Sequence, residues 1–167
     1  AKLGGQAEAE QLAAAIDQEF TKRTGSGGLD ILINNIGGGE YGTILDAGED
    51  FYDQVMNNNC RAAFFLTRVL HPRINDFGRV INLSSVGARL TIPGIIVYTM
   101  AKAAVDAFTR VLAVELGPRG ITVNAVAPGF CETDMTEAVR NAAPGLAKNI
   151  PLKRFGLPED IANAAAW

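Results

Sequence analysis

Helical and strand-like hydrophobic patterns alternate along this chain. In the helical stretches apolar residues recur every three or four positions, and in the strand-like stretches they form short continuous runs. The predicted strands are Leu29–Ile33, Arg79–Leu83 and Ile121–Val126. The predicted helices cover residues 6–24, about 47–70, 98–116, about 134–148 and a last stretch that begins at Pro158. Because short apolar strands alternating with helices form parallel sheets, we expect one α/β domain with a doubly wound, Rossmann-like sheet.

Composition excludes several classes of protein. The chain is 48% hydrophobic and 20% charged, with a net charge of −3 and a pI near 5.2, and it has no basic run that would bind nucleic acid. No apolar stretch approaches the roughly 20 residues of a membrane span. His71 is the only histidine, and Cys60 and Cys131 lack metal-ligand spacing, so neither a metal site nor a Ser-His-Asp triad is expected. Reduced thiols in the cytoplasm are the simplest account of the two cysteines.

Polar or glycine-rich segments follow each of the three predicted strands. These segments are Asn34–Gly37, Ser84–Gly87 and Pro128–Gly129. In open α/β sheets the ligand lies beyond the carboxyl ends of the strands, so each segment is a candidate wall of a cofactor cleft. Loops also use these residue types without any functional reason, and each segment taken singly leaves that interpretation open.

Tyr98 and Lys102 lie four residues apart in a predicted helix, so their side chains extend from the same face. A neighbouring ammonium favours phenolate and lowers the pKa of a tyrosine. Lowering it from about 10 to about 7 requires roughly 4 kcal/mol of differential stabilisation. Such a phenol could act as a general acid or base near neutral pH, although the same spacing arises by chance in many helices.

Asn59 falls on the apolar face of its predicted helix, four residues after Val55 and seven before Leu66, where a hydrophobic residue is expected. A buried amide requires hydrogen-bonding partners. One interpretation assigns Asn59 to a functional site, and the other has it capping a local irregularity of the backbone. The sequence leaves both open.

Together these residues resemble the short-chain dehydrogenase/reductase family, which has the same motifs in the same order along the chain. The interval of 13 residues between Ser85 and Tyr98 is the one usual in the family. The matching segments are Asn34–Gly37 for its Asn-Asn-Ala-Gly motif, Asn59 for its helix asparagine, Ser85 for its serine, Tyr98 and Lys102 for its Tyr-x-x-x-Lys pair, Pro128–Thr133 for its cofactor loop, and the flanking stretches Gly120–Gly129 and Gly156–Asp160.

The resemblance implies an NAD(P)-dependent oxidoreductase that interconverts a carbonyl compound and an alcohol, with a catalytic role for four residues. Tyr98 would exchange a proton with the substrate oxygen, and Ser85 would hydrogen-bond the same oxygen. Lys102 would lower the tyrosine pKa and bind the ribose hydroxyls of the nicotinamide nucleotide. Asn59 would hold a water that links Lys102 to solvent.

The resemblance also implies a set of cofactor contacts. Asn35 and Gly37 would face the cofactor ribose. The Pro128–Gly129 turn, the Cys131 backbone and Thr133 would hold the nicotinamide amide. Whether the cofactor is NAD or NADP stays open, because the residues that select between them would precede Ala1.

Three departures from the family pattern stand out. Ile36 replaces the motif's alanine, and Lys2 lies where the family has an adenine-contacting aspartate. The family's Thr-Gly-x-x-x-Gly-x-Gly phosphate loop is not found, and Thr24–Gly28 is expected to be a connecting loop because it follows a helix and precedes a strand. We therefore expect residues 1–167 to be a single incomplete domain, lacking the first βαβ unit and the last strand.

Other interpretations stay open. A family member that binds a ligand or partner without catalysis is the alternative to an enzyme. Among enzymes, a 3-oxoacyl-thioester reductase, a sugar dehydrogenase and a broad ketone reductase all fit. The apolar segment Arg89–Val97 suggests a wall of a lipophilic substrate pocket, although packing alone would also explain it. Phe64, Phe65, Phe108 and Val111 supply apolar surface for a homodimer or homotetramer.

Overall fold

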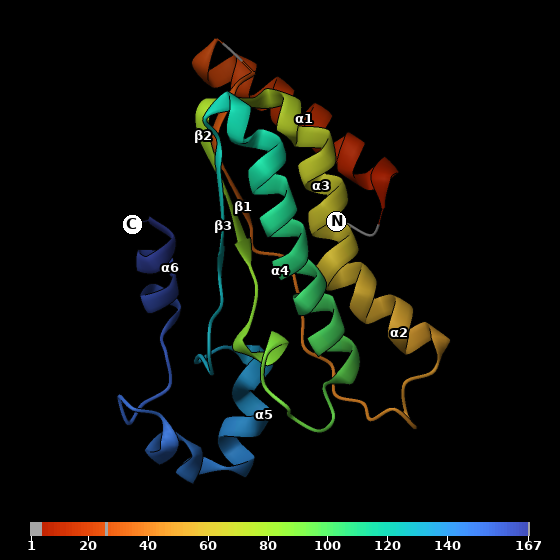
Figure 1. Cartoon of the computed structure of the whole chain (residues 1–167), viewed down its shortest axis with the longest axis vertical. Coiled ribbons are helices and arrows are strands. Elements are labelled where there is room, and N and C mark those ends of the chain that lie inside the picture. The colour runs from red at the N-terminus through yellow and green to blue at the C-terminus, as the bar shows by residue number, and fades with distance from the viewer. Residues whose placement is uncertain (1–4, 26, 167) are drawn as a thin grey trace.

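The computed structural model describes residues 5–25 and 27–166, which form a parallel sheet with helices packed mainly on one side of it (Figure 1). The strands, in spatial order β1-β2-β3, are β1 (Leu29–Asn34), β2 (Ile74–Leu83) and β3 (Thr122–Val126). The helices are α1 (Gln6–Thr24), α2 (Glu49–Met56), α3 (Ala62–Leu70), α4 (Ile96–Leu116), α5 (Asp134–Ala142) and α6 (Pro158–Ala166). The predicted α/β, Rossmann-like fold class is confirmed. Lys2 lies outside the described residues.

The core lies between one face of the sheet and the layer formed by α1, α3 and α4 (Figure 1). Leu32, Val80 and Val123 contribute one buried side chain from each strand. Parallel pairing is continuous toward the carboxyl ends, where Asn34 pairs with Asn82 and Leu83 pairs with Val126. This register brings the three strand ends to a common edge.

The opposite face of the sheet is covered less completely than the first. Within the described residues, α6 is the helix on that side, and it contacts β3 (Figure 1). Ile31 and Ile33 of β1 consequently remain 52% and 49% exposed. The apolar side chains of β1 are therefore buried on one face of the sheet and exposed on the other.

Two predicted helices are interrupted. The stretch expected at 47–70 consists of α2, a π-helical turn (Asn57–Arg61) and α3, because the extra residue of a π turn shifts the helix register without ending the helix. The stretch expected at 134–148 ends at Ala142 and continues as a 3₁₀ helix (Pro144–Asn149), since proline lacks the amide hydrogen that an α-helix requires.

A buried chain of hydrogen bonds ties the sheet to its helices just below the common edge. The Asn34 Nδ2 donates to Thr67 Oγ1 and to Asn82 Oδ1, both at 2.8 Å. The Asn82 Nδ2 in turn donates to Thr109 Oγ1 at 2.9 Å. These polar groups are almost completely buried, so their mutual pairing stabilises one alignment of β1, β2, α3 and α4. In the described part of the chain, no helix has the length and apolarity needed to cross a bilayer.

Candidate active site

The segments that follow β2 and β3 are joined by backbone hydrogen bonds. The Ser84 amide donates to the Val126 carbonyl at 2.8 Å, and the Val86 amide donates to the Pro128 carbonyl at 3.0 Å. The predicted strand-end segments therefore lie side by side, and Ser85 and Gly129 line the same cavity.

Lys102 reaches this edge from α4 through the interior of the protein. It is only 3% exposed, and its Nζ donates a hydrogen bond to the Leu83 carbonyl at 2.9 Å. A Cβ atom added at Gly37 would lie 3.0 Å from this Nζ and 2.7 Å from Asn59 Oδ1. Gly37, Asn59 and Lys102 thus meet at one point, and a side chain at position 37 would collide with both partners.

Asn59 lies within the π turn, and its side chain is fixed on both sides. Its Nδ2 donates to the carbonyls of Val55 and Gly38, each at 2.9 Å, and its Oδ1 accepts from the Gly38 amide at 3.3 Å. The amide bonds an irregular helix turn, as one sequence-based interpretation expected. It also lies beside the strand-end loop that reaches Lys102, and its assignment to a functional site stays a prediction. Single-turn π segments occur often at functional sites.

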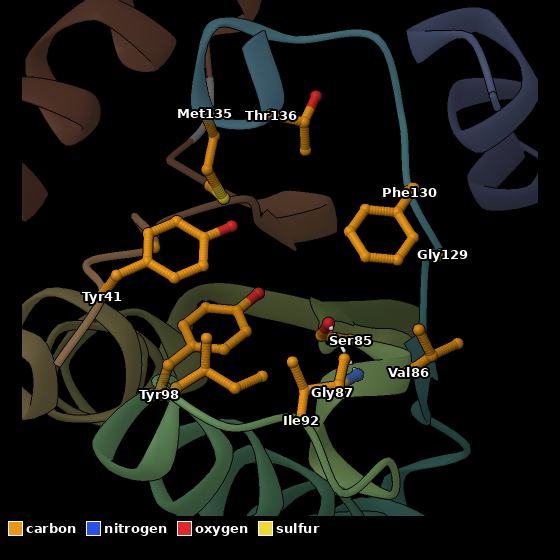
Figure 2. A pocket seen from close by; sticks show the side chains of 12 residues that line it. Tyr41, Ser85, Val86, Gly87, Ile92, Tyr98, Gly129, Phe130, Met135 and Thr136 are labelled. Carbon is orange, nitrogen blue, oxygen red and sulfur yellow. Dashed lines mark hydrogen bonds between the residues drawn. The ribbon is translucent and has the colours of Figure 1, made fainter. Parts of the chain in front are cut away.

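Tyr98 and Ser85 line a common cavity of about 110 Å³ (Figure 2). Gly87 lies between them, since a Cβ at this position would be 3.2 Å from Ser85 Oγ and 3.3 Å from a ring carbon of Tyr98. Ser85 Oγ accepts a hydrogen bond from the Gly87 amide at 3.0 Å. The absence of a side chain at Gly87 therefore lets the serine and the phenol approach the same backbone turn.

The pKa of Tyr98 does not shift in the direction expected from its spacing to Lys102. Burial is the largest cause and raises the pKa of Tyr98, the side chain of Ser85 opposes this by hydrogen bonding, and Tyr41 raises it further. Lys102 Nζ lies 5.8 Å from the centre of the Tyr98 ring. Burial also lowers the pKa of Lys102 to about 8, while Cys60 and Asp106 oppose that shift. The pKa of Tyr98 therefore rises instead of falling as expected, because burial outweighs the hydrogen bond with Ser85.

The remaining predicted cofactor residues lie along the same edge, in two groups. Asn35 is exposed at the end of β1, and Pro128 and Gly129 follow β3. Thr133 is exposed and caps α5 through a capping box with Thr136. Cys131 is partly buried, and its carbonyl accepts a hydrogen bond from Thr136 Oγ1. The structure gathers these residues at one edge, and their contacts to a cofactor stay predictions.

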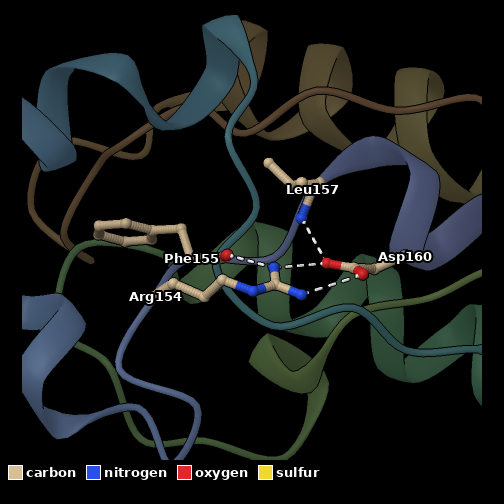
Figure 3. A network of polar contacts seen from close by, with 4 residues as sticks. All are labelled: Arg154, Phe155, Leu157 and Asp160. Atoms are coloured by element: carbon tan, nitrogen blue, oxygen red, sulfur yellow. Dashed lines mark hydrogen bonds and ion pairs between the residues drawn. The ribbon is translucent and has the colours of Figure 1, made fainter.

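The segment Gly156–Asp160 takes part in a network of polar contacts with Arg154 and Phe155 (Figure 3). Asp160 accepts from both terminal nitrogens of Arg154, at 2.6 and 3.1 Å, and from the Leu157 amide at 2.8 Å. Chiefly through the Arg154 hydrogen bond, the pKa of Asp160 falls to about 2. Arg154 also donates to the Phe155 carbonyl at 2.9 Å, and the buried Phe155 ring packs edge-on against Phe130 at 6.3 Å between centroids.

Three large side chains of the cavity were not predicted from the sequence: Tyr41, Phe130 and Met135. All three lie in loops or at the start of a helix, where no repeating apolar pattern shows which side chains point inward. The available signal was their position, since Tyr41 follows the β1 loop glycines and Phe130 lies inside the predicted cofactor loop. The expected wall Arg89–Val97 contributes Ile92 and Ile95, whereas Leu90 is largely exposed.

The residues at this edge fit a nicotinamide nucleotide in their chemistry. Asn35 and Thr133 offer exposed polar groups, and the exposed Gly37 and Gly129 leave the backbone open to a ligand. Within residues 5–25 and 27–166, no glycine-rich turn leads from a strand directly into a helix N-terminus, which a phosphate loop requires. In the same described ranges, no group of three His, Cys, Asp or Glu side chains could hold a metal ion.

The fold and the site together define a Rossmann-like α/β protein with a Ser-Tyr-Lys constellation at the carboxyl edge of its sheet. Residues 5–167 match the family described as Enoyl-(Acyl carrier protein) reductase. The chain belongs to the short-chain dehydrogenase/reductase family, as its motifs indicated.

Similar proteins include reductases of known structure and sequence. The chain is 40% identical over 156 residues to the hydroxynaphthalene reductase-like protein Arp2 of Metarhizium brunneum, covering 84% of this chain and 58% of that protein. It superimposes on the angucycline C-6 ketoreductase LanV with bound NADP at a TM-score of 0.91 and 30% identity, covering 99% of this chain and 65% of that one. For a 3-oxoacyl-[acyl-carrier protein] reductase from Brucella melitensis in complex with NAD, the TM-score is 0.89 and the identity 28%, over 99% and 67% of the two chains. The chain thus spans less than two thirds of the Arp2 relative.

Proposed function

We propose that this protein is an NAD(P)-dependent oxidoreductase that interconverts a carbonyl compound and a secondary alcohol. The observation that carries the proposal is the meeting of Tyr98 and Ser85 at one cavity, with Lys102 and Asn59 gathered behind them at Gly37. A structural role alone does not require a buried lysine and a buried amide at this edge, because burying such groups is costly.

In this proposal the chain's own residues position the substrate and move a proton. Ser85 hydrogen-bonds the substrate oxygen, and Tyr98 donates its phenolic proton to that oxygen during reduction or accepts one during oxidation. Lys102 places a positive charge near the tyrosine ring. Asn59 holds the loop against which Lys102 packs, and it would hold a water that links Lys102 to solvent. The cofactor supplies the hydride, and the protein supplies orientation and the proton.

The residues that would hold the cofactor are those predicted from the sequence. Asn35, Gly37 and Lys102 would bind the ribose side, and the loop from Pro128 to Thr133 would hold the amide of the nicotinamide. The proposal keeps NAD and NADP as alternatives, since LanV was solved with NADP and the Brucella reductase with NAD.

The proposal is tested with the protein expressed from its complete coding sequence. A panel of ketones is added with reduced NAD or NADP, and oxidation of the nicotinamide is followed by absorbance. We expect turnover with at least one ketone and with a preference for one nucleotide. Binding of nucleotide without turnover of any ketone or alcohol would instead favour the non-catalytic ligand- or partner-binding alternative.

The proposal includes self-association through α3 and α4. The rings of Phe64 and Phe108 pack at 5.6 Å between centroids and join the two helices, yet Phe64 is 45% exposed and Val111 is 59% exposed. An apolar surface of this kind indicates an interface between copies, as a homodimer or homotetramer. Sedimentation should show an oligomer at micromolar concentration that Val111→Glu dissociates; a wild-type monomer would contradict this part of the proposal.

Two further parts rest on the sequence. Residues 1–167 form a single Rossmann-like dehydrogenase/reductase domain in this proposal. A cytoplasmic location is supported by the free thiols of Cys60 and Cys131, which persist in a reducing compartment. Limited proteolysis, which should give one resistant unit, and a fractionation experiment test the two statements independently.

A further inference from the structure

The cavity at Tyr98 is lined mainly by apolar and aromatic side chains. Its large side chains are Tyr41, Ile92, Ile95, Tyr98, Phe130 and Met135, and none of the residues that line it is charged. Of its other hydroxyl groups, Thr136 Oγ1 already donates to the backbone of Thr133 and Cys131, and Ser85 Oγ accepts from Gly87. The cavity therefore presents few free polar groups to a ligand.

The aromatic residues occupy opposite sides of this space. Figure 2 shows Tyr41 and Phe130 facing each other across the pocket, with Tyr98 and Ile92 below and Met135 above. The hydroxyl groups of Tyr41 and Tyr98 both point into the space toward Phe130. Their proximity is also expressed in the pKa of Tyr98, which the neighbouring Tyr41 raises.

The two walls differ in how firmly they are held. Phe130 packs against the buried ring of Phe155, whose carbonyl is bonded by Arg154, so its position is fixed from behind. Tyr41 is 56% exposed and lies on the loop after β1, which leaves a broad apolar ring open to the cavity. We call the space between these two facing rings the aromatic slot; a flat aromatic ligand within it would contact both rings.

We propose that Tyr41 and Phe130 select a planar aromatic ketone, one whose carbonyl group belongs to or adjoins a fused ring system. This inference rests on the proposed carbonyl chemistry at Tyr98 and names its substrate class. The cavity of about 110 Å³ is of the order that accepts one aromatic ring, as an apolar cavity of about 150 Å³ accepts benzene. Further rings would extend through the open side past Tyr41.

The alternatives fit this lining less well. A sugar would bury several hydroxyl groups against a wall with few free partners, which is unfavourable. The acyl chain of a thioester would bind to any apolar wall, so an acyl thioester does not require two facing aromatic rings. Aromatic contacts add a preference beyond burial of area, and two such contacts correspond to about a tenfold preference for an aromatic over a saturated ring.

The test compares two ketones of matched shape in the protein expressed from its complete coding sequence. These are 1-tetralone, which has an aromatic ring fused to the cyclic ketone, and 1-decalone, its fully saturated counterpart. We expect kcat/KM to favour 1-tetralone by about tenfold in the wild type. Tyr41→Leu and Phe130→Leu should each lower this ratio at least threefold, and Tyr41→Phe should preserve it because the ring remains.

The matched control is Tyr52→Leu, which removes an exposed tyrosine of α2 that does not line the cavity, and it should leave the ratio unchanged. Equal rates for both ketones in the wild type would overturn the aromatic slot while leaving the carbonyl chemistry intact. An equal loss of the ratio in Tyr41→Phe and Tyr41→Leu would also overturn it, since the hydroxyl rather than the ring would then select. Turnover of no carbonyl compound at all would reject the proposed function itself.

Discussion

Replacing Lys102 with methionine tests the burial of the charge behind the candidate active site. Burial lowers the pKa of Lys102 from 10.5 to about 8, which corresponds to a difference of about 3 kcal/mol between its protonation states. Between these two values the unfolded chain keeps the proton that the folded chain has lost. The unfolded state therefore binds more protons, and the free energy of unfolding rises with pH in this window. Below about pH 8 both states are protonated and the contribution of Lys102 does not change.

The measurement is urea unfolding of the wild type and Lys102→Met at several pH values from 7 to 10.5. Methionine keeps the length of the side chain but cannot titrate, and the loss of the hydrogen bond to the Leu83 carbonyl adds an offset that is constant with pH. The difference in unfolding free energy, wild type minus variant, should be flat up to about pH 8 and then rise by about 3 kcal/mol. A difference that stays constant across the whole range would refute the reasoning.

Two other substitutions test the packing around the site. Gly87→Ala places a methyl group 3.2 Å from Ser85 Oγ and 3.3 Å from the Tyr98 ring, so both side chains must move by a few tenths of an ångström. Because Ser85 and Tyr98 position the substrate oxygen, we expect kcat to fall about three- to tenfold. The control is Gly48→Ala, which should retain the wild-type rate because the added carbon has open space around it. Asn59→Leu removes both hydrogen bonds donated to Val55 and Gly38 without adding a charge beside Lys102, and urea unfolding at neutral pH should show a loss of about 2–4 kcal/mol. A loss below about 0.5 kcal/mol would show that the amide is not fixed as described.

The strands and helices could be predicted because the spacing of apolar residues within each one is visible in its own sequence. The stripe of α4 is an example, since Ala101, Val105 and Leu112 recur at helical spacing and all three are buried. The π turn was not predicted because one extra residue shifts the helical face without removing it. Asn59 was a visible exception to the apolar face, and only the structure shows that it bonds both its own helix and the Gly38 loop.

The candidate site was predictable to the extent that topology alone determines it. Parallel strands place Asn35, Ser85 and Gly129 at one edge, and helical spacing places Tyr98 near Lys102. The depth of burial was not predictable, because it depends on tertiary packing, and it reverses the expected direction of the Tyr98 pKa. Tyr41 and Met135 were likewise missed, since a loop or the first turn of a helix gives no period that assigns a side chain to a cavity.

The most direct test of the central claim is the turnover of Tyr98→Phe in the protein expressed from its complete coding sequence. The ring still packs against Gly87, and only the transferable proton is lost. With a ketone that the wild type reduces, we expect kcat to fall by about 10²–10⁴-fold, while the Kd for the nicotinamide nucleotide stays close to the wild-type value. A variant that retains more than about a tenth of the wild-type rate would contradict the role of Tyr98 as the proton donor.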